Sequence, residues 1–139
     1  ELQTRPTVRK MGNADSLEGI YMNGLEDLTP QQVAEGLKAG TMILIDVREP
    51  REYAVERIHG TLNHPLSTLE PAVMPVDGSR RVVLSCAGGR RSAVAAIHCQ
   101  DAGVNVDAHL AGGLGAWKAA GLPFTAIDPD TGEIISDGK

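Results

Sequence analysis

Length, composition and charge narrow the class of protein. The chain has 139 residues, of which 42% are hydrophobic and 22% are charged, which indicates one globular domain and excludes disorder throughout. Thirteen lysines and arginines against 18 acids give a net charge of −5. A nucleic-acid partner is therefore not expected, because general nucleic-acid binders carry a basic surface.

Cysteine content and the absence of long apolar runs indicate the compartment. Two cysteines, Cys86 and Cys99, are too few for a disulfide framework. The sequence contains no run of about 18 apolar residues, so no membrane partner is expected. We expect a soluble, cytoplasmic protein. Residues 1–20 are polar and aperiodic and are expected to be a flexible arm or a segment foreign to the native protein.

Strand and helix patterns alternate along residues 21–125, the expected domain. Thr29, Pro30 and Gly40 mark the start and stop of a first helix. Apolar runs at 42–47 and 82–85 predict strands that are buried on both faces of a parallel sheet, and 105–110 is a weaker strand candidate. Further helices are expected at 50–58, 92–103 and 113–121.

This alternation predicts an α/β fold with a central, mainly parallel sheet flanked by helices. Residues 126–139 hold four acids and are expected to be an acidic, solvated tail or an edge hairpin. Their likeness to a calcium loop fails because Gly132 comes one place too early. The four histidines offer no closely spaced ligand pair, so no metal is expected.

The most informative residue is Cys86, which follows the strand at 82–85 and precedes a glycine-rich turn and a helix. The carboxyl end of a strand is where open α/β sheets bind ligands. Turn N–H groups and a helix N-terminus attract anions, and the same field lowers the pKa of a thiol. Gly88 and Gly89 leave room for the backbone to curl around a small ligand.

Charge in this segment points the same way. Residues 80–92 hold four arginines and no acid, a local +4 that is expected to attract a small oxyanion. The ordinary alternative is a buried cysteine before a plain turn. The combination of a thiol with two glycines, two arginines and Ser92 as a helix cap favours the anion site.

Three segments then resemble the signatures of single-domain rhodaneses, a family of thiosulfate or persulfide sulfurtransferases. They are LIDVREPREYAVERIHGTLNHPL at 44–66, CAGGRRS at 86–92 and LAGGLGAWKAAGLPF at 110–124. The resemblance covers about residues 25–125 and implies a three-layer rhodanese-like domain. Four positions depart from the family's usual residues: Glu56, Arg57, His59 and Thr61.

The resemblance implies a mechanism. Cys86 would take sulfur from an anionic donor as a persulfide and pass it to cyanide, a thiol or a protein carrier, without cofactor or metal. Arg91 would hold donor oxyanions, and Arg90 would face outward toward a donor or carrier. The residues expected to bind substrate are Ala87, Gly88, Gly89, Arg90, Arg91 and Ser92.

Other residues have supporting interpretations. Asp46 and Arg48 end the strand at 42–47 beside the expected site, either as an ion pair that supports the loop or as ligand contacts. His59 and His64 lie in a turn that could border the pocket. Cys99 falls on a helical stripe and is expected to pack in the core, as is Trp117.

Three other functions remain open. A cysteine phosphatase of the same fold has five residues between its cysteine and arginine, whereas four separate Cys86 from Arg91, and the smaller ring suits a sulfur atom. An arsenate reductase would need a thiol partner that the sequence does not identify. An inactive binding module is disfavoured by the intact Cys86.

Overall fold

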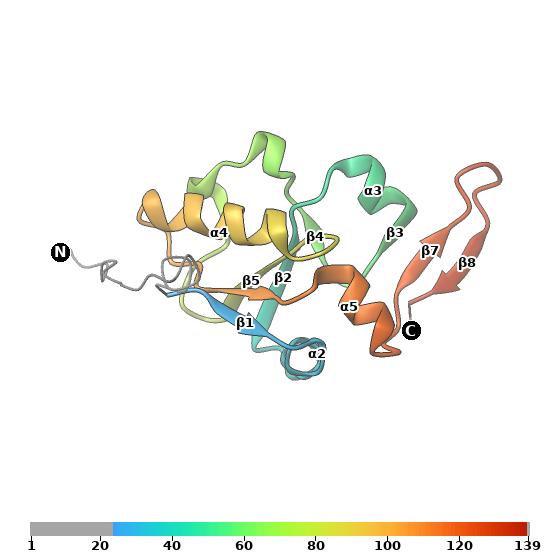
Figure 1. Cartoon of the computed structure of the whole chain (residues 1–139), viewed down its shortest axis with the longest axis horizontal. Helices are drawn as coiled ribbons and strands as arrows, with labels where there is room; N and C mark the ends of the chain where they lie inside the picture. Colours follow the sequence, from blue (N-terminus) through green and yellow to red (C-terminus); the bar gives the residue numbers. More distant parts are fainter. Residues whose placement is uncertain (1–23, 139) are drawn as a thin grey trace.

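A computed structural model describes residues 24–138, and the expected arm at 1–20 lies outside them. Its centre is a five-stranded sheet in the order β1-β6-β5-β2-β4, with every neighbouring pair parallel (Figure 1). The strands are β1 (Glu26–Leu28), β2 (Met42–Asp46), β4 (Leu62–Asn63), β5 (Arg81–Ser85) and β6 (Ala108–Leu110).

Helices cover both faces of this sheet. On one side lie α4 (Arg90–Asp101) and the short 3₁₀ helices η2 (Leu66–Thr68) and η3 (Pro71–Val73). On the other lie α2 (Pro30–Ala39) and α5 (Gly113–Ala119) (Figure 1). The expected three-layer α/β fold with a central parallel sheet is confirmed.

The two central strands supply side chains to both layers, as their continuous apolar runs predicted. Ile45 of β2 and Leu84 of β5 belong to the core cluster under α4. Their neighbours Leu44 and Val83 belong to the cluster under α2 and α5, which includes the buried Trp117. Because successive strand residues face opposite ways, Cys86 joins Leu84 on the α4 side.

The first helix begins and ends where the sequence predicts, and the next two helices have shifted boundaries. Thr29 caps α2 with a reciprocal capping box, and Gly40 ends it at φ 74°. The helix expected at 50–58 is shorter: α3 spans Pro50–Val55, because Glu56–Arg57 form β3. Helix α4 begins at Arg90, two residues before the expected Ser92.

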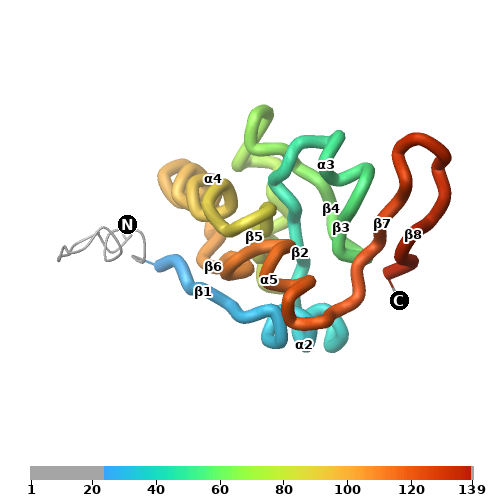
Figure 2. The backbone as a smooth tube through the Cα atoms, turned by 45° about the vertical axis from the view of Figure 1, so that its right-hand side comes forward, coloured from blue at the N-terminus to red at the C-terminus, as the bar shows by residue number. Residues whose placement is uncertain are grey.

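A second, three-stranded antiparallel sheet lies beside the domain centre. It has the order β3-β7-β8 and joins β3 (Glu56–Arg57) to the hairpin of β7 (Thr125–Ile127) and β8 (Ile134–Asp137) (Figure 2). Residues 126–139 therefore include an edge hairpin, and the boundary between domain and tail stays a prediction. None of the helices within residues 24–138 is both long and apolar enough to cross a membrane.

Candidate active site

Cys86 is the first residue after β5, and its sulfur faces a ring of backbone donors. The N–H of Gly89 lies 3.0 Å from Sγ and the N–H of Ser92 lies 3.3 Å from it. The Ser92 hydroxyl oxygen lies at 3.5 Å. Cys86 is 1% exposed, while the adjoining Ala87 and Gly88 are exposed.

These donors determine the direction in which the pKa of the Cys86 thiol shifts. Burial by itself raises the pKa of the Cys86 thiol, but hydrogen bonds from the Ser92 side chain and from backbone N–H groups of Ser92, Gly89 and Gly88 outweigh it. The net effect is a pKa below the ordinary thiol value. Hydrogen bonds to an anion favour the charged form, so this site favours a thiolate.

Local backbone geometry explains why the donors converge. Gly89 is the N-cap of α4 with φ 100°, a conformation that costs glycine little. The first N–H groups of a helix have no partner within the helix, and here the loop closes back so that the sulfur receives them. The backbone N–H groups therefore converge on the sulfur, but the helix cap is Gly89, and Ser92, which was expected to cap the helix, lies inside α4.

The start of α5 packs directly against this loop. Leu114 N–H donates to the Cys86 carbonyl at 2.8 Å, and Gly115 N–H donates to the Ala87 carbonyl at 3.0 Å. A Cβ on Gly113 would lie 2.2 Å from the Cys86 carbonyl oxygen, so only glycine fits there. The glycine pair of the 110–124 segment therefore supports the Cys86 loop, a role that the sequence analysis did not assign.

Arg91 is bound to a carboxylate that the sequence analysis did not select. Its two terminal nitrogens donate to the two carboxylate oxygens of Glu52, at 2.9 and 3.1 Å. This hydrogen bonding lowers the pKa of Glu52 from 4.5 to about 2. The Arg91 guanidinium is therefore already bound, and a donor oxyanion would have to share it with Glu52. Arg90 is exposed.

Asp46 and Arg48 form a buried ion pair at the end of β2. Arg48 Nη2 lies 2.8 Å from Asp46 Oδ2, with side chains 5% and 7% exposed. The Asn63 side-chain amide donates to the backbone carbonyls of both residues, and Arg48 Nη2 also donates to the Glu56 carbonyl. These contacts fit the supporting role, since the pair ties β2 to the segments that follow it.

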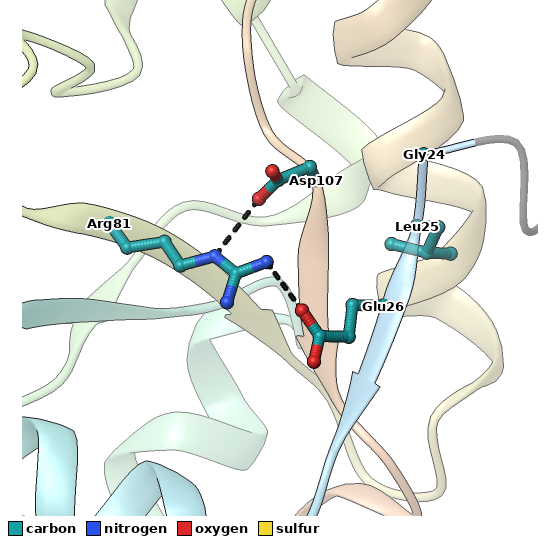
Figure 3. Close-up of a pocket in the computed structure, with 5 residues that line it drawn as sticks. All are labelled: Gly24, Leu25, Glu26, Arg81 and Asp107. Carbon is teal, nitrogen blue, oxygen red and sulfur yellow. Dashed lines mark hydrogen bonds and ion pairs between the residues drawn. The ribbon is translucent and has the colours of Figure 1, made fainter.

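The local +4 charge does not gather at Cys86. Arg81 begins β5, at the opposite end of the strand, and is bound there by Glu26 at 2.8 Å and Asp107 at 3.0 Å. Figure 3 shows this pair of contacts at a pocket that is also lined by Gly24 and Leu25. The expectation was wrong because a strand separates the two arginine pairs that are near in sequence.

Two further residues extend from Ser92 away from the loop. Ser92 Oγ lies 2.8 Å from Nδ1 of His109 on β6, and His109 Nε2 lies 2.6 Å from Asp27 on β1. Sequence spacing could not reveal them, because they reach Ser92 only through parallel strand pairing. Only the register of β1 against β6, which aligns Asp27 with His109, would have revealed this pair.

His59 lies in the turn after β3 and His64 follows β4, and no hydrogen bond of the described residues links either histidine to Cys86. His64 Nε2 accepts from the Glu70 N–H at 3.0 Å, and His59 is exposed. Among residues 24–138, no three His, Cys, Asp or Glu side chains come together as metal ligands.

Sequence and structural comparisons identify the family. The model of the family described as "Rhodanese-like domain" matches residues 29–120. The chain belongs to the rhodanese-like family. An uncharacterised protein of Synechocystis sp. is 40% identical over 96 residues, covering 69% of this chain and 54% of the relative, so the chain spans about half of that relative's length.

Other members of the rhodanese-like family carry more specific descriptions. A sulfurtransferase of Allochromatium vinosum is 32% identical over 85 residues, covering 61% of this chain and 79% of its own. Thiosulfate sulfurtransferase from Pseudomonas aeruginosa superposes with a TM-score of 0.65 at 25% identity, over 75% of this chain and 22% of its own. Distant relatives of this rhodanese-like chain are therefore sulfurtransferases.

One similar structure carries a different description. A Rhodopseudomonas palustris protein of unknown function, described as a "possible tyrosine phosphatase", superposes with a TM-score of 0.62 at 30% identity, over 81% of this chain and 97% of its own. The rhodanese-like fold is thus common to proteins that are described by two different chemistries.

Proposed function

We propose that this rhodanese-like chain is a sulfurtransferase that carries sulfane sulfur on Cys86. The observation that carries the proposal is the Cys86 sulfur itself, which receives the N–H groups of Gly89 and Ser92 at 3.0 and 3.3 Å. Such donors stabilise a thiolate before reaction and an anionic persulfide after it. The lowered pKa of Cys86 supports the same role.

The reaction consists of two displacements at sulfur. The Cys86 thiolate attacks the outer sulfur of thiosulfate or a persulfide, forming a new S–S bond. The old S–S bond of the donor breaks, and sulfite or a thiolate leaves with the electron pair. Cyanide, a thiol or a protein carrier then attacks the outer sulfur of the Cys86 persulfide, and Cys86 leaves as a thiolate.

Exposure and charge around Cys86 suit this substrate class. Cys86 is nearly buried, which favours a donor whose reactive sulfur is a terminal atom. Ala87, Gly88 and Arg90 are exposed at the same loop, where they would meet the donor or a carrier protein. Arg91 would orient an oxyanion with the part of its guanidinium that Glu52 leaves available.

Loop length favours sulfur over phosphate. Four residues separate Cys86 from Arg91, and the five-residue spacing of cysteine phosphatases makes a larger ring for a whole phosphoryl group. The phosphatase chemistry of the same fold is therefore the second candidate and is less well supported.

The test is the mass of the intact protein after incubation with thiosulfate. We expect the mass of one added sulfur atom, located by peptide mapping to Cys86 and removed by cyanide or a thiol. Cys86→Ser should abolish both the added mass and thiocyanate production, and Cys99→Ser is the matched control that should keep both. Turnover retained by Cys86→Ser, or Cys86-dependent hydrolysis of an aryl phosphate in place of sulfur loading, would overturn the proposal.

A further inference from the structure

A continuous series of polar groups leads from the Cys86 sulfur to the outer strand of the sheet. Cys86 Sγ lies 3.5 Å from Ser92 Oγ, Ser92 Oγ lies 2.8 Å from His109 Nδ1, and His109 Nε2 lies 2.6 Å from Asp27 Oδ1. Ser92 is fully buried and His109 is 5% exposed. The series ends at Asp27, whose side chain is 56% exposed.

Partner chemistry assigns the hydrogens along this series. A carboxylate only accepts hydrogen bonds, so His109 Nε2 carries the hydrogen shared with Asp27. In a neutral ring Nδ1 is then the acceptor, and it takes the hydroxyl hydrogen of Ser92. The Gly89 carbonyl is a more distant acceptor for that hydroxyl, at 3.3 Å. Ser92 Oγ is left to accept the S–H of Cys86.

We propose that His109, oriented by Asp27 and acting through Ser92, takes up the proton of the Cys86 thiol and so keeps Cys86 a thiolate. The Cys86 S–H bond breaks as its proton passes to Ser92 Oγ, and the hydroxyl proton of Ser92 passes to His109 Nδ1. Only protons move in this step, and no atom changes its oxidation state. Ser92 then donates to the thiolate, and the imidazolium donates to Ser92 and Asp27.

The groups around His109 allow this charge. Asp27 on β1 faces it directly, and Cys86 faces it through Ser92 of α4. Its register partner on β5 is Leu84, which is apolar. The other buried residues of α4 are Ala95, Ala96 and Cys99, and Cys99 is a thiol whose pKa is raised by burial, so it adds no charge.

Nearby charged groups are bound to other partners. Glu26 precedes Asp27 in the sequence, and Asp107 precedes β6. Both acids bind Arg81 at the amino end of β5. Arg91, next to Ser92 on α4, binds Glu52. Asp27 is therefore the acid that compensates an imidazolium at His109, and its exposed carboxylate lets solvent exchange the proton.

This inference rests on the proposed function only in taking Cys86 as the reactive group, so its test needs no sulfur donor. We would measure the rate at which iodoacetamide alkylates Cys86 from pH 5 to 9, quantifying the Cys86 peptide by mass. His109→Gln should move the midpoint upward by roughly one pH unit, which is about a tenfold slower rate below both midpoints. His98→Gln is the matched control, because His98 is exposed at the other end of α4.

Further variants separate this role from a structural one. Asp27→Asn should shift the midpoint in the same direction by less, since that charge is half exposed. Ser92→Ala should shift it at least as far as His109→Gln, and adding His109→Gln to Ser92→Ala should cause no further shift, because His109 acts only through Ser92. Far-ultraviolet circular dichroism would verify folding of each variant.

Two results would overturn the inference. One is a His109→Gln midpoint equal to that of the wild type in a folded protein, and the other is additivity in the double variant. A shifted midpoint together with failure to load sulfur from thiosulfate would leave the role of His109 standing and refute the sulfurtransferase proposal. Sulfur loading from thiosulfate together with an unshifted alkylation midpoint in His109→Gln would support the sulfurtransferase proposal and refute the role of His109.

Discussion

Cys86 and Cys99 are two buried thiols in one core cluster, but they differ in their pKa shifts and in the hydrogen bonds at their sulfur atoms. Their exposures are 1% and 0%, yet the pKa of Cys86 is lowered and that of Cys99 is raised by burial. Burial acts on both in the same direction. The opposite pKa shifts therefore come from hydrogen bonds. Within residues 24–138, backbone N–H groups donate to the sulfur of Cys86 and not to that of Cys99.

The same helix produces both environments. The N-terminus of α4 has N–H groups without helical acceptors, and two N–H groups around it, those of Gly89 and Ser92, point at Cys86. Cys99 lies near the end of α4, where N–H groups are already bonded to carbonyls four residues earlier. A buried thiol that faces the N-terminus of α4 therefore receives hydrogen bonds that lower its pKa, whereas a thiol within the helix does not.

Among the predicted changes, displacing the Cys86 loop should have the largest effect, because it would remove the hydrogen bonds that distinguish Cys86 from Cys99. Gly113→Ala places a Cβ against the Cys86 carbonyl, so the loop must shift and the donors lose their alignment with Sγ. We expect sulfur loading from thiosulfate to fall at least about tenfold and the free energy of unfolding to fall by about 2 to 3 kcal/mol. Urea unfolding and intact mass after thiosulfate treatment measure the two effects.

The matched control is Gly121→Ala, just after α5. Gly121 has φ 76° with no atom within 4 Å of its added Cβ, so this change carries the backbone strain without the contact. It should lower the free energy of unfolding by about 1 kcal/mol and leave sulfur loading intact. Equal loading by the two variants would show that the loop does not depend on its contact with α5.

How much the sequence revealed depends on the distance along the chain between interacting groups. The Cys86 loop could be predicted because Gly88, Gly89 and Ser92 are neighbours of Cys86 and interact locally. Glu52 is 39 residues from Arg91, and Asp27 is 82 residues from His109. Parallel strands are joined by long crossovers with no tight turn to set their register, so the Asp27–His109 pair could not be predicted. The Glu52–Arg91 pair joins α3 to α4, and the spacing of residues along the sequence does not show which helices meet.

The same reason explains the error about charge. Arg81 and Arg91 lie close in sequence, but an extended strand rises about 3.3 Å per residue, and β5 has five residues. Arg81 therefore lies at the amino end of β5, away from Cys86, where Glu26 and Asp107 bind it (Figure 3). A charge count along a sequence window does not distinguish the two ends of a strand.

The packing cysteine offers a second, smaller test. Cys99→Ala removes a fully buried sulfur and should lower the free energy of unfolding by about 1 kcal/mol, while sulfur loading on Cys86 stays unchanged. Ala102, three residues further along, lies exposed at the end of α4, so the buried stripe of this helix ends at Cys99. Urea unfolding and intact mass would check both expectations.

A disulfide between the two thiols would contradict this contrast. Both cysteines are free in the structure, and Cys99 is held within the regular turns of α4. Peptide mapping of the mildly oxidised, folded monomer should recover oxidation at Cys86 alone. A dominant bond from Cys86 to Cys99 would mean that α4 unwinds and that Cys99 takes part in the chemistry.

The smallest expected effect concerns the ion pair between Glu52 and Arg91, which lies near Cys86 and has no counterpart near Cys99. Glu52 and Arg91 are joined by two hydrogen bonds, but their side chains are 29% and 36% exposed. Solvent screening reduces such pairs to about 0.5 to 1 kcal/mol. Glu52→Gln should therefore lower the free energy of unfolding by about that amount at pH 7.

The pH dependence of this loss identifies its cause. The pKa of Glu52 is lowered on folding from 4.5 to about 2, so the unfolded chain binds the proton first as the pH falls. The stabilisation is fully present above pH 4.5 and disappears between pH 4.5 and 2. Urea unfolding of wild type and Glu52→Gln should differ at pH 6.5, differ less as the pH falls below 4.5, and converge as it falls toward 2. A difference that stays constant over this range would show that Glu52 acts by packing and not by its charge.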